Sequence, residues 1–340
     1  MLKLTIIMPS FNRGQYIREA LDSVFCQQTN YQFKIIIADD ASTDNTLEII
    51  KEYKDKYPDK IEIWTSEKNQ GLHQNILRVY RNIKTDYWTV LDPDDYWTDN
   101  LLIQKALVFF ENNKEWTIYA ANINVIDQTT NDKRQTTNMP YVRLKPKYKI
   151  IDSSFQDYLN GKAVLSCTQA SFYRNIFNDE LFNKMAQIDL EIAKQAFRGD
   201  SFRNAVHLYK GNAHFVNEIC AVYRITGTGL WTAISEFAKN NLNTLIFMVL
   251  FKFFDEKYPQ LKRFAYKTFN INKNIILSII KGNYEKGILS EAQIDAFFYL
   301  LKQFIQNPVS TDDKSISLKN KIRLKIYGYL KSKVSEKGLD

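Results

Sequence analysis

The most informative segment of this 340-residue chain is Asp86–Trp97, which reads DYWTVLDPDDYW. Its first half, Tyr87–Leu91, is an aromatic and β-branched apolar run that is typical of a strand buried in a sheet. Three carboxylates follow within four residues, at Asp92, Asp94 and Asp95, with a proline between them that ends strand pairing. Neighbouring carboxylates repel one another unless a cation or several donors lie between them. The segment therefore predicts either a Mg²⁺ or Mn²⁺ site at a strand end or an acidic turn that caps the next helix.

Strand and helix patterns alternate four times within about the first hundred residues, and this segment is the fourth strand. The three upstream strand patterns are Leu2–Met8, Phe33–Ala38 and Ile61–Thr65. Such alternation predicts a parallel sheet with right-handed crossovers and helices on its faces. Polar loops follow the first, second and fourth strands, and in a parallel sheet these loops emerge at one edge. We therefore expect Phe11, Asp40 and the pair Asp92 and Asp94 to line one crevice.

The composition is that of an ordinary globular protein with a basic balance. Hydrophobic residues make up 45%, charged residues 25%, and the net charge is +8. This charge favours anionic partners such as nucleotide phosphates or a membrane face, while the scattered lysines match no nucleic-acid-binding module, so no nucleic acid is expected. Cys26, Cys167 and Cys220 lack metal-ligand spacing and indicate free thiols in a reducing compartment. With no signal-peptide pattern and no spanning apolar run, we expect a cytoplasmic protein, or one peripheral on the inner face of the cytoplasmic membrane.

Four segments resemble, in order and spacing, the family 2 glycosyltransferases with the GT-A fold. They are TIIMPSFN at 5–12, IIADDASTDNT at 36–46, NQG at 69–71 and LDPDDYW at 91–97. Each is a weak signal alone, but four in register over residues 1 to about 110 form a specific match. The resemblance, to enzymes of the bacterial cell-envelope or capsule type, implies a Rossmann-like, mostly parallel sheet flanked by helices. It also implies transfer of a sugar from a nucleotide-sugar with inversion at the anomeric carbon.

The resemblance implies donor-binding roles for residues of the loops at the crevice. They are Pro9, Phe11, Asp39, Asp40, Asn69, Gly71, Asn75, Asp92 and Arg224. Phe11 would pack on the base, and Asp40, or its rival Asp39, would accept a hydrogen bond from it. Uracil offers an imide N–H of this kind, so we expect a UDP-sugar, although thymine in a dTDP-sugar offers the same group. From the residues alone, Phe11 could instead fold over the strand edge and Asp40 form an Asx turn ahead of the helix.

Asp92-Pro93-Asp94 matches the DxD motif of the family. The match implies a Mn²⁺ or Mg²⁺ ion, with Asp94 as the preferred ligand and Asp92 near both the ribose and the metal. Asp95 and Trp97, which follow directly, would then lie on the acceptor side of the site.

The segment Arg198–Arg203 reads RGDSFR. At this distance after the DxD, the family has a Gly-Asp or Glu-Asp pair whose Asp is the catalytic base. The resemblance thus assigns the base to Asp200 and an acceptor-side place to Gly199, whereas the simpler interpretation of Asp200 is a helix N-cap. Relatives often carry His two residues after Arg224, where this chain has Thr226. Contacts to the diphosphate would then fall to Arg224 or to backbone amides of the glycine-rich turn that follows.

The expected organisation is a GT-A domain over 1–232, with a nucleotide-binding half at 1–110 and an acceptor-binding half at 111–232. Ser166–Tyr173 is read as a further strand of the second half. A helical extension is expected over 233–340. It includes a basic amphipathic pattern at residues 318–334, which is typical of a helix on an anionic membrane and equally of a solvated helix with one face on the core. The expected partners are the nucleotide-sugar and a glycan or lipid-linked acceptor.

Two other functions are compatible with an α/β sheet of this kind. A sugar nucleotidyltransferase of similar fold would need a glycine-rich, basic loop after the first strand, and Pro9-Ser10-Phe11-Asn12 is not one. A non-catalytic carbohydrate- or nucleotide-binding protein would not need its acidic residues intact. Both alternatives are therefore less favoured than a glycosyltransferase.

Overall fold

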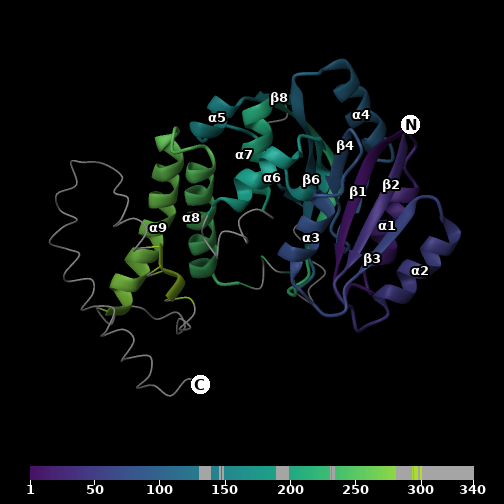
Figure 1. The fold of residues 1–340 in the computed structure, drawn as a ribbon, viewed down its shortest axis with the longest axis horizontal. Helices are drawn as coiled ribbons and strands as arrows, with labels where there is room; N and C mark the ends of the chain where they lie inside the picture. The colour runs from purple at the N-terminus through teal and green to yellow at the C-terminus, as the bar shows by residue number, and fades with distance from the viewer. Residues whose placement is uncertain are drawn as a thin grey trace. The chain divides into compact units, whose positions relative to one another are not determined.

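The computed structural model describes residues 1–129, 139–144, 147, 149–188, 199–229, 231 and 234–280, together with 293, 295–297, 299 and 300. The chain forms two compact units, Met1–Thr232 and Ala233–Asp340 (Figure 1). The assignment of residues 1–232 to a GT-A domain, and its division into a donor half and an acceptor half, stay predictions.

Strands and helices alternate along the first unit. The strands are β1 (Leu2–Ser10), β2 (Gln32–Asp39), β3 (Ile61–Thr65), β4 (Tyr87–Val90), β5 (Tyr96–Trp97), β6 (Trp116–Asp127), β7 (Met139–Pro140), β8 (Ile150–Ser153), β9 (Ser171–Arg174) and β10 (Asn212–Ile225). The helices are α1 (Ile17–Phe25), α2 (Thr46–Lys56), α3 (Leu72–Tyr80), α4 (Leu102–Asn112), α5 (Phe155–Leu159), α6 (Asp179–Ala186) and α7 (Asp200–Lys210), with a 3₁₀ turn η1 (Thr168–Ala170).

The described strands form one mixed sheet in the order β3-β2-β1-β4-β9-β6-β10-β5, with β7 paired to β6 and β8 to β10. Strands β3, β2, β1 and β4 pair in parallel, as the βα alternation predicts. Strand β9 is antiparallel to both β4 and β6, and β6 pairs in parallel with β10. Six strands therefore run in one direction, so that the loops after β1, β2, β4 and β10 emerge at one edge of the sheet. The predicted fold class, an α/β sheet flanked by helices, is confirmed.

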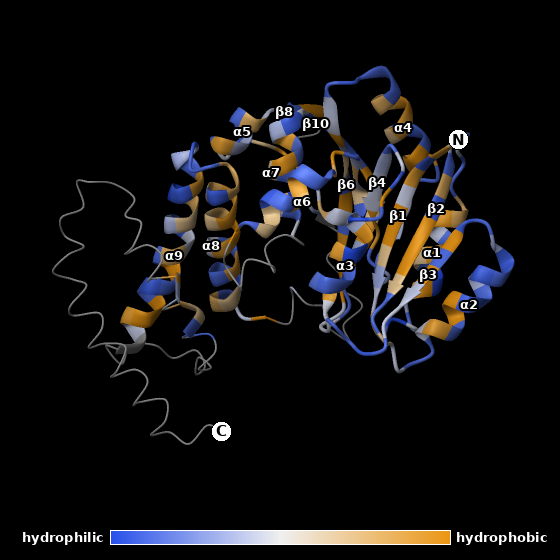
Figure 2. Cartoon of the chain, in the orientation of Figure 1, coloured by the Kyte–Doolittle hydropathy of each residue, from blue (hydrophilic) through white to orange (hydrophobic). Residues whose placement is uncertain are grey.

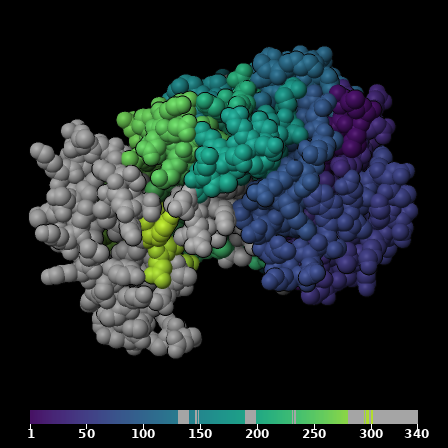
Figure 3. Space-filling model, viewed as in Figure 1, coloured from purple at the N-terminus to yellow at the C-terminus, as the bar shows by residue number. Residues whose placement is uncertain are grey.

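Successive strand residues point to opposite faces, and each face of the sheet has its own apolar cluster. Ile6 and Met8 of β1 pack with residues of α1, α2 and α4, whereas Ile7 packs with residues of α3 and α7. In Figure 2, β1 and β2 carry hydrophobic colours over most of their length. In Figure 3, the blue and teal parts of the first unit form one continuous body. Packing on both faces thus fixes the strand ends that the site is built on.

The strand expected at Ser166–Tyr173 is shorter than its apolar pattern indicated. Strand β9 begins only at Ser171, and η1 precedes it. The side chains of Thr168 and Gln169 explain the difference, because each hydrogen-bonds an acidic side chain of another segment. This polar turn lies directly beside the candidate site.

The described part of the second unit consists mainly of α8 (Glu236–Phe253) and α9 (Pro259–Ile280), which pack along each other. Phe297 stacks on Phe269 with ring centroids 4.8 Å apart. The expected helical extension is confirmed for these two helices, while the basic pattern at 318–334 lies outside the described residues. Among the described helices, none combines the length and apolar character that crossing a membrane requires.

Candidate active site

The loops after β1 and β2 are tied together at the crevice. Asn12 adopts a left-handed φ of 51°, its backbone N–H donates to Ser42 Oγ at 2.9 Å, and its Oδ1 accepts from the Thr43 N–H at 2.8 Å. Pro9 is buried in β1, whereas the neighbouring Phe11 is 39% exposed. The Phe11 ring is therefore open to a ligand, as stacking on a base requires.

The two adjacent acids at the end of β2 have different contacts. Asp39 accepts from the backbone N–H of Ser42 at 2.9 Å and from its hydroxyl at 2.5 Å. Asp40 accepts from the backbone N–H groups of Gln70, at 2.9 Å, and Gly71, at 2.7 Å. The turn after β2 is thus held by Asp39, through Ser42 three residues later, and not by an Asx turn of Asp40. Each carboxylate has two donors and retains lone pairs, so the donor-binding roles of Asp40 and of its rival Asp39 stay predictions, with Asp40 on the α3 side.

The turn before α3 presents the other residues expected at the donor. Gly71 has φ 81° and ψ 153°, and its N–H also lies 2.8 Å from Asn69 Oδ1. Asn75 is buried in the first turn of α3 and donates its side-chain amide to the Ala38 carbonyl at 2.6 Å. In the described part of the chain, Asn75 Oδ1 has no hydrogen-bond donor. Asn69, Gly71 and Asn75 are therefore all linked to the end of β2.

The DxD acids form the most negative part of the site. No group among the described residues donates a hydrogen bond to the partly buried Asp92 carboxylate. Burial, together with the charges of Asp94 and Asp200, raises the pKa of Asp92 to about 7. A divalent cation with a preference for oxygen would relieve this repulsion, so Asp92 and Asp94 fit a Mn²⁺ or Mg²⁺ ion.

Asp95 and Trp97, expected on the acceptor side, have a different place. Asp95 is fully buried, and its carboxylate accepts from the backbone N–H of Arg224 at 2.8 Å and from the side-chain amide of Gln169. Burial and the two DxD charges raise the pKa of Asp95 well above its usual range. Trp97 is 4% exposed and donates its indole N–H to the Gln169 carbonyl at 2.6 Å. Both side chains hold the DxD loop from within the core, and their assignment to the acceptor side is corrected.

The Arg224 side chain does not reach freely into the crevice. Its guanidinium donates to the Asp94 carbonyl at 3.1 Å and forms an ion pair with Glu19. It also lies over the rings of Tyr96, at 4.5 Å, and Tyr16, at 5.5 Å. Through these contacts the Arg224 side chain holds the backbone of the DxD loop. This corrects the prediction that the side chain contacts the donor diphosphate.

Asp200 lies at the first position of α7, and Gly199 is the N-cap residue. The Asp200 side chain is 39% exposed, and its Oδ1 accepts from the Thr168 hydroxyl and from the Arg203 guanidinium. The N-cap alternative for Asp200 is therefore replaced by a carboxylate held by Thr168 of η1 and by Arg203 of α7 itself. Gly199 contributes the turn into the helix, and its acceptor-side role stays a prediction.

Three polar residues of the site escaped the sequence analysis. Arg13 places its Nε 3.3 Å from Asp94 Oδ2, while Thr168 and Arg203 contact Asp200. Arg203 had a local signal, since a residue three positions after an acid on a helix lies on the same face. Arg13 directly follows a predicted site loop and could also have been found. Thr168 is 32 residues from Asp200 and gives no local signal.

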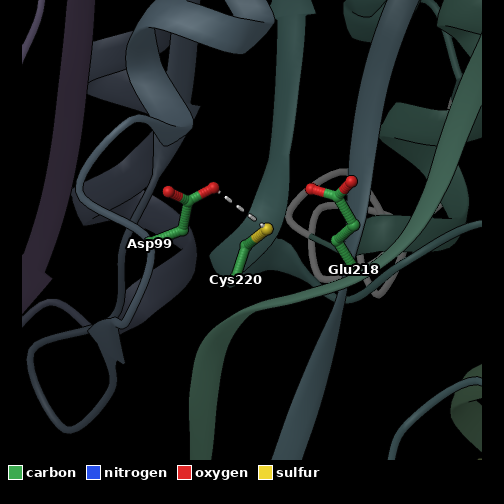
Figure 4. A group of neighbouring side chains, drawn as sticks. All are labelled: Asp99, Glu218 and Cys220. Carbon is green, nitrogen blue, oxygen red and sulfur yellow. Dashed lines mark hydrogen bonds between the residues drawn. The ribbon is translucent and has the colours of Figure 1, made fainter.

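A second acidic group is not a comparable metal site. Asp99, Glu218 and Cys220 have ligand atoms within 4.8 Å of one another, and the Cys220 thiol points to Asp99 (Figure 4). Lys105 already supplies the cation, because its Nζ lies 2.8 Å from Asp99 and 2.9 Å from Glu218. Burial, with the charge of Asp99, raises the pKa of Cys220 to about 12, which disfavours the thiolate that binds metals. This group is a structural ion-pair cluster.

Comparison with known proteins agrees with this geometry. The profile described as "Glycosyl transferase family 2" matches residues 5–182, which is more than half of the chain. The chain belongs to glycosyl transferase family 2. An uncharacterized protein of Mycobacterium tuberculosis is 28% identical over 228 residues, which cover 67% of this chain and 60% of that protein. An uncharacterized glycosyltransferase of Mycoplasma pneumoniae is 36% identical over 106 residues, covering 31% of this chain and 36% of the relative.

The matched residues span 60% or less of the length of these two relatives. Among solved structures, residues 1–349 of Staphylococcus aureus TarS in complex with UDP align with a TM-score of 0.58. The alignment has 16% sequence identity and covers 90% of this chain and 81% of that one. At this identity the likeness concerns the fold alone, and it confirms the expected GT-A arrangement.

Proposed function

We propose that this chain is an inverting, divalent-metal-dependent glycosyltransferase that moves a sugar from a UDP-sugar to a hydroxyl group of a glycan or lipid-linked acceptor. The observation that supports this best is that the carboxylates of the DxD pair and the separate carboxylate of Asp200 lie near one another at one edge of the sheet. The DxD pair follows β4, and Asp200 at the start of α7 is close enough to raise the pKa of Asp92. A carboxylate pair for a cation beside a separate carboxylate for a proton suits displacement at a sugar carbon.

The leaving-group side of the site would be the DxD side. Asp94 and Asp92 would hold the metal, and a bound Mn²⁺ or Mg²⁺ neutralises the negative charge that develops on the diphosphate. Arg13, 3.3 Å from Asp94, would add a fixed positive charge at the same place. The backbone that presents Asp94 is anchored by Arg224 and by the buried Asp95. Preorganised charges of this kind need no rearrangement during the reaction.

Asp200 would act as the general base. An acceptor hydroxyl loses its proton to the Asp200 carboxylate while its oxygen forms a bond to the anomeric carbon. The bond from that carbon to the diphosphate breaks, and its electron pair leaves with UDP. Attack opposite the leaving group inverts the anomeric centre without a covalent enzyme intermediate. Asp200 suits this task because it comes from a segment separate from the DxD and is 39% exposed.

Contacts at the β2 end support a uridine donor. Phe11 offers an exposed ring, and Asp40 offers a buried carboxylate beside the turn at Gly71. A carboxylate has about four lone-pair sites, so Asp40 can accept from a base in addition to its two backbone donors. TarS, whose solved complexes contain UDP and UDP-GlcNAc, supports the choice of a UDP-sugar.

The distribution of charge between the two units supports a choice of acceptor. Residues 1–232 contain 28 Lys and Arg against 28 Asp and Glu, whereas residues 233–340 contain 18 against 10. The whole excess of +8 therefore belongs to the second unit. Basic segments are attracted to anionic lipid, which supports peripheral contact with the inner face of the cytoplasmic membrane and a lipid-linked or envelope-glycan acceptor.

The test is the release of UDP from UDP-GlcNAc and other UDP-sugars, with Mn²⁺ and with excess chelator. Replacing Asp200 with Asn should lower kcat by about 10²–10⁴-fold and leave UDP affinity in calorimetry unchanged. Replacing Asp94 with Asn should abolish the metal dependence of UDP binding. Full turnover in excess chelator would contradict metal dependence, and near wild-type turnover of Asp200→Asn would contradict the base assignment.

The same assay separates the two alternatives. A sugar nucleotidyltransferase would release pyrophosphate from a nucleoside triphosphate and a sugar phosphate. A non-catalytic binding protein would bind UDP without releasing it from any UDP-sugar, in the presence of any acceptor.

A further inference from the structure

The described residues hold the Asp200 carboxylate through one of its two oxygens. Thr168 Oγ1 and Arg203 Nη2 both donate to Oδ1, and Arg203 Nη2 also lies 2.9 Å from Thr168 Oγ1. The three groups form a closed triangle between η1 and α7. Among the described residues, no donor contacts Oδ2, and the Asp200 side chain makes no further hydrogen bond or ion pair there.

Arg203 is itself fixed from two other elements. Its side chain is only 3% exposed, its Nη1 donates to the Tyr80 hydroxyl of α3 at 3.1 Å, and its guanidinium lies 5.9 Å from the Tyr173 ring of β9. A buried Arg with hydrogen bonds to several elements loses little further freedom when it binds a carboxylate. Residues from α3, β9, η1 and α7 therefore determine where one oxygen of Asp200 lies.

We infer that Thr168 and Arg203 are positioning residues that hold Asp200 by Oδ1 and leave Oδ2 to take the acceptor proton. The inference rests on the proposed function, because it assigns an orientation to the base of that reaction. Proton removal needs a base oxygen within about 2.6–3.2 Å of the hydroxyl, which a freely rotating carboxylate would reach only part of the time. When the acceptor O–H bond breaks, the proton stays on Oδ2 while Oδ1 keeps both of its donors.

The surroundings of Asp200 give this triangle an electrostatic effect as well. The ionisable groups that interact with Asp200 are Asp92 after β4, Cys167 before η1, Tyr80 of α3, Tyr173 of β9, Tyr141 after β7 and Arg203 of α7. The negative charge of Asp92 repels the Asp200 carboxylate, whereas the Arg203 cation attracts it and the Thr168 hydroxyl donates to it.

The test compares Thr168→Val with Thr168→Ser, using UDP release from UDP-GlcNAc as the rate. Val has a similar shape to Thr but no hydroxyl. We expect Thr168→Val to lower kcat by about tenfold or more, the factor of one hydrogen bond to a charged group. UDP affinity measured by calorimetry should stay the same. Thr168→Ser restores the hydroxyl and should recover most of the rate.

A wild-type rate in Thr168→Val would overturn the inference. Arg203→Lys provides a second variant, because it keeps the charge but loses the planar pair of donors, and it should lower kcat more than it changes KM. Thermal melting of each variant identifies any loss through unfolding. If Asp200→Asn loses its activity while Thr168→Val and Arg203→Lys do not, only the positioning role is wrong. If Asp200→Asn stays active, the proposed base itself is wrong.

Discussion

At the scale of single residues, His207 links burial to pH. It lies on α7, 1% exposed, with its ring 4.8 Å from that of Tyr173 and 5.6 Å from that of Trp88. Burial lowers the pKa of His207 from 6.5 to about 4. Between these pH values the unfolded chain binds a proton at His207 that the folded chain does not. The contribution of His207 to the free energy of unfolding is therefore fully present above about pH 6.5, and it is lost as the pH falls toward 4.

His207→Phe removes this titration and keeps an aromatic ring. We expect the free energy of unfolding of the wild type to fall with decreasing pH more steeply than that of the variant. The difference in slope should approach one proton, about 1.4 kcal/mol per pH unit. Urea unfolding between about pH 4.5 and pH 7.5 measures both slopes. If the free energies of unfolding of the wild type and the variant change with pH in parallel, His207 is not the source of the pH dependence.

Arg13 is the second residue with a distinct expected effect. Its Nη1 donates to the Asn12 carbonyl at 3.0 Å, so its charge is fixed by its own loop as well as by Asp94. A fixed cation near the DxD repels a metal ion but attracts a diphosphate. Arg13→Gln should therefore bind Mn²⁺ alone more tightly and UDP with Mn²⁺ less tightly than the wild type. Calorimetric titrations of each ligand test this, and two changes of the same sign would contradict it.

At the scale of elements, α3 joins the two sides of the site. The turn at its N-terminus gives backbone N–H groups to Asp40, and its last residue, Tyr80, gives an acceptor to Arg203. The helix is nine residues long and packs on the sheet through Ile76 and Val79. A rigid element of this length keeps the expected donor contacts and the expected base at a fixed separation.

Gly71→Ala tests the N-terminal end of this element. The φ of 81° with a ψ of 153° is a region that residues with a Cβ avoid, at a cost of about 1–3 kcal/mol. A Cβ at Gly71 would meet no atom within 4 Å, so backbone strain is the only penalty. We expect the turn to shift, the bond to Asp40 to weaken and UDP affinity to fall. Gln70→Ala keeps its backbone N–H to Asp40 and should bind UDP as the wild type does.

At the scale of the whole molecule, the unequal charge of the two units predicts how the protein meets a membrane. Each basic residue near an anionic surface contributes about 1 kcal/mol, so the excess of the second unit supports reversible binding. We expect the full chain to co-sediment with vesicles that contain phosphatidylglycerol, and less so in high salt or with neutral vesicles. A chain of residues 1–315 should bind more weakly, because it lacks the basic pattern at 318–334. Equal sedimentation of the two chains would exclude that segment as the contact.

The sequence by itself determined the sheet, its flanking helices and the loops that form the site. Apolar residues at a period of two, or of three to four, can be buried in only one way, so β1 to β4 and α1 to α3 follow from local pattern. The proline after Asp92 and the polar run after β2 likewise locate the acidic loops without tertiary information. Asp40, Asp92 and Asp94 lie in these loops, whereas Asp200 was indicated by the resemblance to the family.

Only the tertiary structure decided what each polar side chain contacts. Asp39 and Asp40 are neighbours in sequence, yet their carboxylates have different hydrogen-bond partners, Ser42 for Asp39 and Gly71 for Asp40. Asp95 turns into the core because Arg224, 129 residues away, presents its backbone N–H there. Thr168 reaches Asp200 because β9 and α7 bring distant segments together. Such pairings depend on strand order and register, so the apolar pattern of each segment does not predict them.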